Sequence, residues 1–202
     1  MKVIRDASEE EMILEFLKGE MDSVRFNNEL FDVLSDLGID RNIIDNGDIF
    51  NSDENKKRFE ILKLFRGYPN SELFNNFPKN VKWKYCELSS NDINNIYYIN
   101  YDYWNELSNN TGSPLEAVKN IKNGIEIYEV SNKPILEGVN LLGKKMFPPI
   151  ILLTCNDKKY VIIEGHSRMT IYGFNPSKLN GTYAYIGYCN SEEMNQYDSR
   201  MI

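Results

Sequence analysis

Histidine is almost absent from this 202-residue sequence, and cysteine is scarce. His166 is the only histidine, and the three cysteines, Cys86, Cys155 and Cys189, are far apart and form no Cys-x-x-Cys pair. A zinc site would have to be assembled from these scattered residues, so the sequence argues against one. An odd number of dispersed cysteines is typical of buried thiols in a reducing compartment. We therefore expect a cytoplasmic protein whose thiols are reduced.

Positive charge is in deficit, and no stretch is apolar for long. Lys and Arg number 23 against 30 Asp and Glu, which gives a net charge of -7, whereas proteins that bind duplex nucleic acid usually have a basic face. The longest mostly apolar stretch, residues 147–154, is too short to cross a bilayer, and the N-terminus lacks the apolar core of a signal peptide. These features argue against nucleic acid and membranes as partners.

What the sequence does contain supports a folded chain with two unlike parts. Hydrophobic residues make up 42% of it and charged residues 26%, an ordinary globular balance. Residues 1–80 predict a helical N-terminal region: Ser8 and Glu11 have the spacing of a capping box, a second helix is expected at 26–37, and Ser52 is expected to cap a third.

Residues 81–202 have a different pattern, in which short apolar runs alternate with helix signals. The expected strands lie at 81–88, 150–154, 160–163 and 183–189. The expected helices begin at Pro114, at His166 and after Asn190. This mixture predicts an α+β domain over 81–202, preceded by the helical region.

One junction between an expected strand and an expected helix concentrates polar side chains, Glu164-Gly165-His166-Ser167-Arg168. The first amides of a helix have no internal partner, so a phosphate placed there accepts several hydrogen bonds. Gly165 lets the backbone turn sharply, and Arg168 and Ser167 can add donors. Glu164 is placed to bind a divalent cation or to accept a proton. The junction predicts a phosphate site; a purely structural turn is the alternative, because strand-Gly-helix junctions are common.

The order and types of these residues resemble the ParB/sulfiredoxin superfamily. The resemblance runs through 149–152, 160–168 and 184–193, with 83–88 as the opening strand, and so covers about residues 81–195. It implies a mixed-sheet domain that holds nucleotide phosphates at the glycine turn. The nearest pattern is the acid-Gly-His-x-Arg form of the free-serine kinases and related uncharacterised domains.

The resemblance also implies roles for individual residues. Glu164 would bind metal or act as a base, and His166 and Glu87, the latter at the end of the first strand, would be further catalytic candidates. The implied phosphate-binding residues are Gly165, His166, Ser167 and Arg168. The implied cofactor is ATP or another nucleotide with Mg²⁺, and the implied activity is that of a phosphotransferase or NTPase.

The sequence departs from the best-understood branches of the superfamily. Sulfiredoxins have a catalytic cysteine after the glycine, where this chain has His166, and chromosome-partitioning ParB proteins have Glu-Arg-Arg and a downstream helix-turn-helix. Two alternatives therefore stay open. One is a non-catalytic interaction module that keeps the fold and binds a protein partner through residues 1–66. The other is a ParB-like nuclease, against which the acidic charge argues.

Two further motifs are weaker. The segment 138–145 nearly spells a phosphate-binding P-loop, but Lys145 stands where Ser or Thr should hold magnesium. An aromatic cluster could stack a nucleic-acid base or pack in the core, and we expect packing because aromatic side chains dominate cores. Its members are Tyr97, Tyr98, Tyr101, Tyr103 and Trp104.

Overall fold

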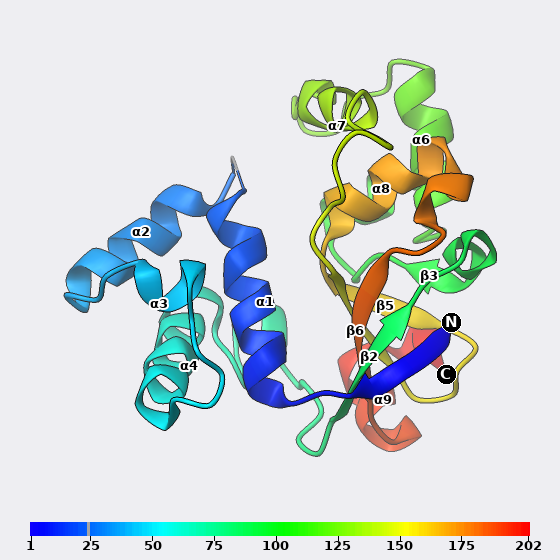
Figure 1. Cartoon of the computed structure of the whole chain (residues 1–202). Helices are drawn as coiled ribbons and strands as arrows, with labels where there is room; N and C mark the ends of the chain where they lie inside the picture. Colours follow the sequence, from blue (N-terminus) through cyan, green and yellow to red (C-terminus); the bar gives the residue numbers. More distant parts are fainter. Residues whose placement is uncertain (24) are drawn as a thin grey trace.

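The computed structural model describes residues 1–23 and 25–202 and has a mixed α/β fold, in which a six-stranded sheet is flanked by helices (Figure 1). The strands are β1 (Lys2–Asp6), β2 (Lys82–Glu87), β3 (Ile96–Tyr97), β4 (Ile150–Thr154), β5 (Tyr160–Glu164) and β6 (Tyr183–Tyr188). The α-helices are α1 (Glu9–Met21), α2 (Asn27–Asp36), α3 (Asn42–Asp45), α4 (Ser52–Arg66), α5 (Asp102–Leu107), α6 (Pro114–Lys122), α7 (Lys133–Val139), α8 (His166–Phe174) and α9 (Ser191–Tyr197). Short 3₁₀ helices are η1 (Glu72–Phe74), η2 (Ser90–Asn95), η3 (Pro176–Leu179) and η4 (Ser199–Met201).

The sheet is mixed, with the strand order β1-β2-β6-β4-β5-β3. β4 runs parallel to β6 and β3 parallel to β5, whereas the other neighbouring pairs are antiparallel. All five residues of β4 are buried, as is typical of a central strand covered on both faces. The hairpin from β4 to β5 turns through Asn156 and Asp157 as expected, with Asp157 in the left-handed region at φ 57°. This hairpin brings the end of β5, and the start of α8, next to the start of β4.

Much of the predicted helical pattern is confirmed, with one corrected cap. Ser8 and Glu11 form the capping box of α1. The cap of α4 is Asn51 rather than Ser52, because the Asn51 side chain accepts hydrogen bonds from the amides of Asp53 and Glu54. Ser52 is already the first helical residue, so an asparagine one position earlier satisfies the free amides.

The sequence did not predict every element. The first residues of the expected helical region form β1, which pairs antiparallel with β2 through Val3 and Cys86. All five residues of β1 are exposed, so the strand lacks the alternation by which strands are found. The part of the chain between 89 and 149, where the only expected element is the helix that begins at Pro114, also contains β3, α5 and α7. The segment that nearly spells a P-loop begins within α7 and does not follow a strand.

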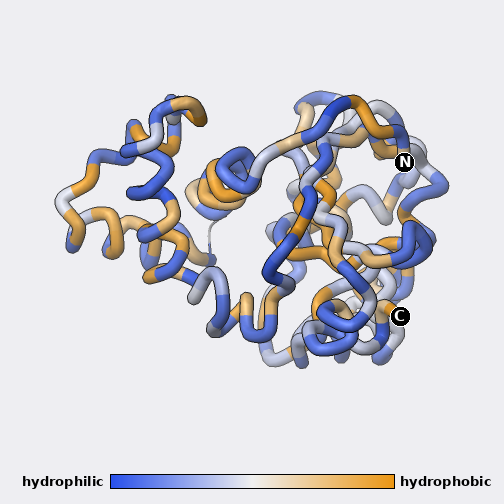
Figure 2. The backbone as a smooth tube through the Cα atoms, turned by 90° about the horizontal axis from the view of Figure 1, so that it is seen from below, coloured by the Kyte–Doolittle hydropathy of each residue, from blue (hydrophilic) through white to orange (hydrophobic). Residues whose placement is uncertain are grey.

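The helix α1 connects the two parts of the molecule. It lies between the helices α2 to α4 and the sheet, as Figure 1 shows. In Figure 2, where this helix is seen nearly end-on, it again lies between the two parts. Met12, Phe16 and Leu17 of α1 are fully buried, and the Phe16 ring lies 5.6 Å from that of Phe74. Hydrophobic residues of both parts thus belong to one continuous core. Within residues 1–23 and 25–202, no helix is both long and apolar enough to cross a membrane.

Candidate functional site at the junction of β5 and α8

The turn from β5 into α8 has the backbone that the sequence predicts. Gly165 has a φ of 98°, and an added Cβ would lie 3.1 Å from the Ile150 side chain, so any other residue there would be both strained and crowded. The first helical bond runs from the Met169 amide to the Gly165 carbonyl over 2.8 Å. Among the described residues, no atom accepts a hydrogen bond from the amides of His166, Ser167 and Arg168. Ser167 itself is exposed.

The Arg168 guanidinium is engaged by protein groups. Its Nη1 donates to the carbonyls of Pro148 and Pro149 over 2.8 and 2.6 Å, and its Nη2 donates to the Glu164 carboxylate. The side chains of Arg168 and Glu164 are only 13% and 12% exposed, and burial lowers the pKa of Arg168. Arg168 therefore fastens α8 to the start of β4. The sequence predicted a contact with phosphate instead, and in this conformation these donors are occupied.

The helix α1 covers the Glu164–Arg168 pair. A Cβ on Gly19 would lie 2.9 Å from both Arg168 Nη2 and the Glu164 carboxyl carbon, so only glycine permits this close approach. Glu15 of α1 lies near enough for the charge of Arg168 to oppose the rise in its pKa that burial causes. Glu164 is thus paired and covered. No group of three or more metal-ligating side chains occurs in the part of the chain that the structure describes.

His166 lies inside an aromatic stack. Its ring is nearly parallel to that of Trp104 at a centroid distance of 5.2 Å, and Trp104 stacks on Tyr98 at 4.5 Å. Tyr98 and Trp104 are buried, as expected of core packing, whereas Tyr97 and Tyr103 are half-buried and Tyr101 is 44% exposed. Burial, and secondarily the charge of Arg66, lower the pKa of His166 to about 3. The imidazole is therefore neutral near pH 7, and its buried Nε2 has no hydrogen-bond partner among the described residues.

A cation that sequence reasoning missed comes from the helical region. Arg66, at the end of α4, donates from Nη2 to Glu20 over 3.1 Å, and its guanidinium carbon lies 3.9 Å from the centre of the Phe26 ring. Its Nε is buried and has no partner among the described residues. The charge of Arg66 lowers the pKa of His166, so this guanidinium lies within electrostatic reach of the junction. In the sequence, Arg66 is an ordinary basic residue in a last helical turn, a position that gives no sign of this contact.

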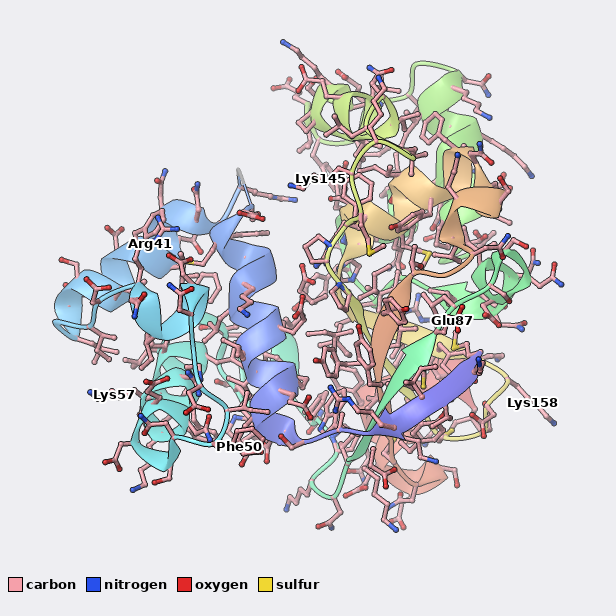
Figure 3. All side chains as sticks on the ribbon, viewed as in Figure 1. Arg41, Phe50, Lys57, Glu87, Lys145 and Lys158 are labelled. Carbon is pink, nitrogen blue, oxygen red and sulfur yellow. The ribbon has the colours of Figure 1, made fainter. Side chains whose placement is uncertain are left out.

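The structure does not bring Glu87 to the other predicted site residues. Glu87 ends β2 and forms an ion pair with Lys2 at 3.7 Å (Figure 3). β6 and β4 lie between β2 and β5 in the sheet, which puts Glu87 three strand spacings, or about 14 Å, from Glu164. Glu87 and Glu164 cannot act on one small group at that separation.

Two hollows in the surface lie away from the junction. One is lined by Arg5, Ser8, Glu10, Glu11, Ile49, Phe50 and Asn55. The other is lined by Asp6, Ala7, Glu9, Val81, Lys82, Trp83 and Lys84. Neither of these two hollows contains a residue of the β5–α8 junction.

Comparison of the chain with protein-family models, with curated proteins and with solved structures found no match. A functional proposal therefore depends on the geometry of the junction and on the physical chemistry of its groups.

Proposed function

We propose that the protein binds a nucleotide through its phosphate groups at the start of α8, in a domain of the ParB/sulfiredoxin type. The observation that supports this most is the set of three free amides of His166, Ser167 and Arg168, which follow a glycine turn. Such amides carry partial positive charge and donate to phosphate oxygens. The exposed Ser167 hydroxyl adds one more donor.

The charged residues have other roles here than those that the sequence predicts. Arg168 and Glu164 hold the turn in shape, because they already bind each other and the start of β4. Arg66 contributes positive charge from the helical region, because its guanidinium lies within electrostatic reach of His166. Mg²⁺ would arrive bound to the nucleotide, as it commonly does in phosphoryl-transfer sites. Any phosphotransferase or NTPase activity would rest on positioning and charge neutralisation.

Calorimetric titration of the full-length chain with ATP, CTP, GTP and ADP, each with Mg²⁺, tests the proposal. We expect at least one of them to bind, and Ser167→Asp to weaken that binding because its carboxylate would repel the phosphate. The same change stabilises a helix start, so loss of folding would not explain the result. Absence of binding by all four nucleotides to the folded protein would refute the proposal.

A matched control uses another helix of the same domain. Ser191 is the exposed first residue of α9, and Ser191→Asp adds the same charge in the first turn of that helix. We expect Ser191→Asp to leave nucleotide binding unchanged. Phosphate release from ATP would then distinguish an NTPase from a binding domain, and we expect no cleavage of plasmid DNA incubated with Mg²⁺.

A second candidate function, binding of a protein partner by the helical region, is favoured by exposed apolar side chains. Phe50 is 90% exposed and Leu64 56% exposed. Large exposed apolar side chains on a folded surface are common at protein interfaces. If Phe50→Ser abolishes the cellular activity while Ser167→Asp preserves it, this candidate replaces nucleotide binding.

A further inference from the structure

Cys155 and Cys189, which are far apart in the sequence, follow two neighbouring strands in register. Thr154 at the end of β4 pairs with Tyr188 at the end of the parallel strand β6. The Cys189 amide donates to the Thr154 carbonyl over 3.0 Å and so extends the ladder by one residue. Neighbouring strands lie about 4.8 Å apart, which falls within the separation of roughly 4.4–6.8 Å that disulfide-bonded Cα atoms show.

The two thiols also share one local environment. Cys189 Sγ lies 3.5 Å from the Thr154 carbonyl oxygen, which belongs to the peptide bond that leads into Cys155. Burial raises the pKa of Cys189 to about 12, and the neighbouring Cys155 thiol is the next largest cause. Both residues are half-buried, whereas Cys86 is fully buried in the core. A small reagent therefore meets Cys155 and Cys189 before it meets Cys86.

We propose that Cys155 and Cys189 form a dithiol site that closes into a disulfide by exchange with a small disulfide such as oxidised glutathione. The Cys155 thiol loses its proton to solvent and attacks the reagent, which releases one small thiol. Cys189 then loses its proton and attacks Cys155 Sγ, which releases the second small thiol. The two protein thiols are oxidised, and the reagent is reduced to two thiols.

Both pKa shifts set the pH dependence of this closure. Thiol–disulfide exchange requires the thiolate, and burial raises the pKa of both Cys155 and Cys189. Closure is therefore slow at neutral pH and accelerates as the pH rises.

The test is incubation of the folded full-length chain with oxidised glutathione at pH 8.5, followed by non-reducing peptide mapping. We expect a peptide that links Cys155 to Cys189 and a fall in free thiols from three to one. Cys86→Ser is the matched control, because it removes a thiol outside the pair and leaves the link intact. Cys155→Ser and Cys189→Ser each abolish the link.

A second measurement separates a folded site from chance collision. In urea, where the register of β4 and β6 is lost, we expect mixed pairings that include Cys86. A folded chain that keeps all three thiols free, or that carries only glutathione adducts with no linked peptide, would overturn the proposal. So would a link that forms at the same rate in urea and in the folded chain.

Discussion

The sheet part and the helical region each contribute one half-buried arginine near the β5–α8 junction, and the two arginines differ in how many hydrogen-bond donors they have left unused. Arg168 of α8 donates to two carbonyls and a carboxylate. Arg66 of α4 donates to one carboxylate, stacks on Phe26, and retains a buried Nε without a partner among the described residues. Within the described residues, the arginine of the recognisable motif is thus held by protein groups, whereas an arginine outside the motif keeps an unpaired donor.

Of the changes considered, replacing Arg168 should cause the largest loss of stability. Arg168→Met leaves the buried Glu164 carboxylate and the Pro148 and Pro149 carbonyls without their donor. We expect a loss of about 3–5 kcal/mol in the free energy of unfolding, measured by urea denaturation. Arg41→Met, which breaks the exposed pair with Asp45, should cause no measurable change. Equal losses in the two variants would mean that Arg168 does not hold the turn.

Because His166 is held neutral in the folded protein, acid should lower the stability of the protein. Its folded pKa is about 3 against an ordinary value of 6.5, so the unfolded chain gains a proton in a range where the folded chain does not. The stability from this group is complete above 6.5 and is lost as the pH falls toward 3, by about 2 kcal/mol at pH 5. His166→Phe keeps an aromatic ring against Trp104 and should remove this loss of stability in acid. An unchanged difference in stability between pH 7 and pH 5 in the variant would contradict the assignment.

The contact between the two parts can be loosened at Gly19. An added methyl group would meet Arg168 Nη2 and the Glu164 carboxyl at 2.9 Å. Alanine is favoured over glycine within a helix by about 1 kcal/mol, and overpacking costs about 1–3 kcal/mol. We expect a net destabilisation of about 1 kcal/mol for Gly19→Ala in thermal unfolding and a larger one for Gly19→Leu. Stabilisation by alanine would show that α1 does not pack closely on the pair.

The smallest effect concerns Glu20, the partner of Arg66. Burial raises the pKa of Glu20, against the opposing charge of Arg66. Its contribution to stability is complete below the ordinary value of 4.5 and is lost as the pH rises through the folded pKa, which is the opposite sign to His166. We expect Glu20→Gln to remove a slope worth about 1 kcal/mol or less. Denaturation between pH 4.5 and pH 7 measures it, and a slope that persists would assign the titration elsewhere.

The sequence predicts local structure here better than it predicts how residues far apart meet. The capping box of Ser8, the glycine turn at Gly165 and the start of α6 at Pro114 follow from local chemistry. The sequence does not predict β1 because all its residues are exposed and its partner, β2, lies beyond the helices along the chain. Sequence spacing likewise gives no sign that Arg66 faces the junction, because only the packing of α1 and α4 brings it there.

The pairing of β1 with β2 has a consequence for how the molecule can be divided. Asp6 and Lys84 are register partners, and the Ala7 amide donates to the Trp83 carbonyl over 3.0 Å, so residues 7–81 leave and re-enter the sheet at neighbouring points. The helices α1 to α4 are thus an insertion between two antiparallel strands that pair with each other. A truncation from the N-terminus would also remove the edge strand from the sheet, whereas replacing 8–80 with a short turn would keep that strand. Because the folded helices hold the two strand ends together, their assembly supplies the loop closure that β1 needs in order to pair.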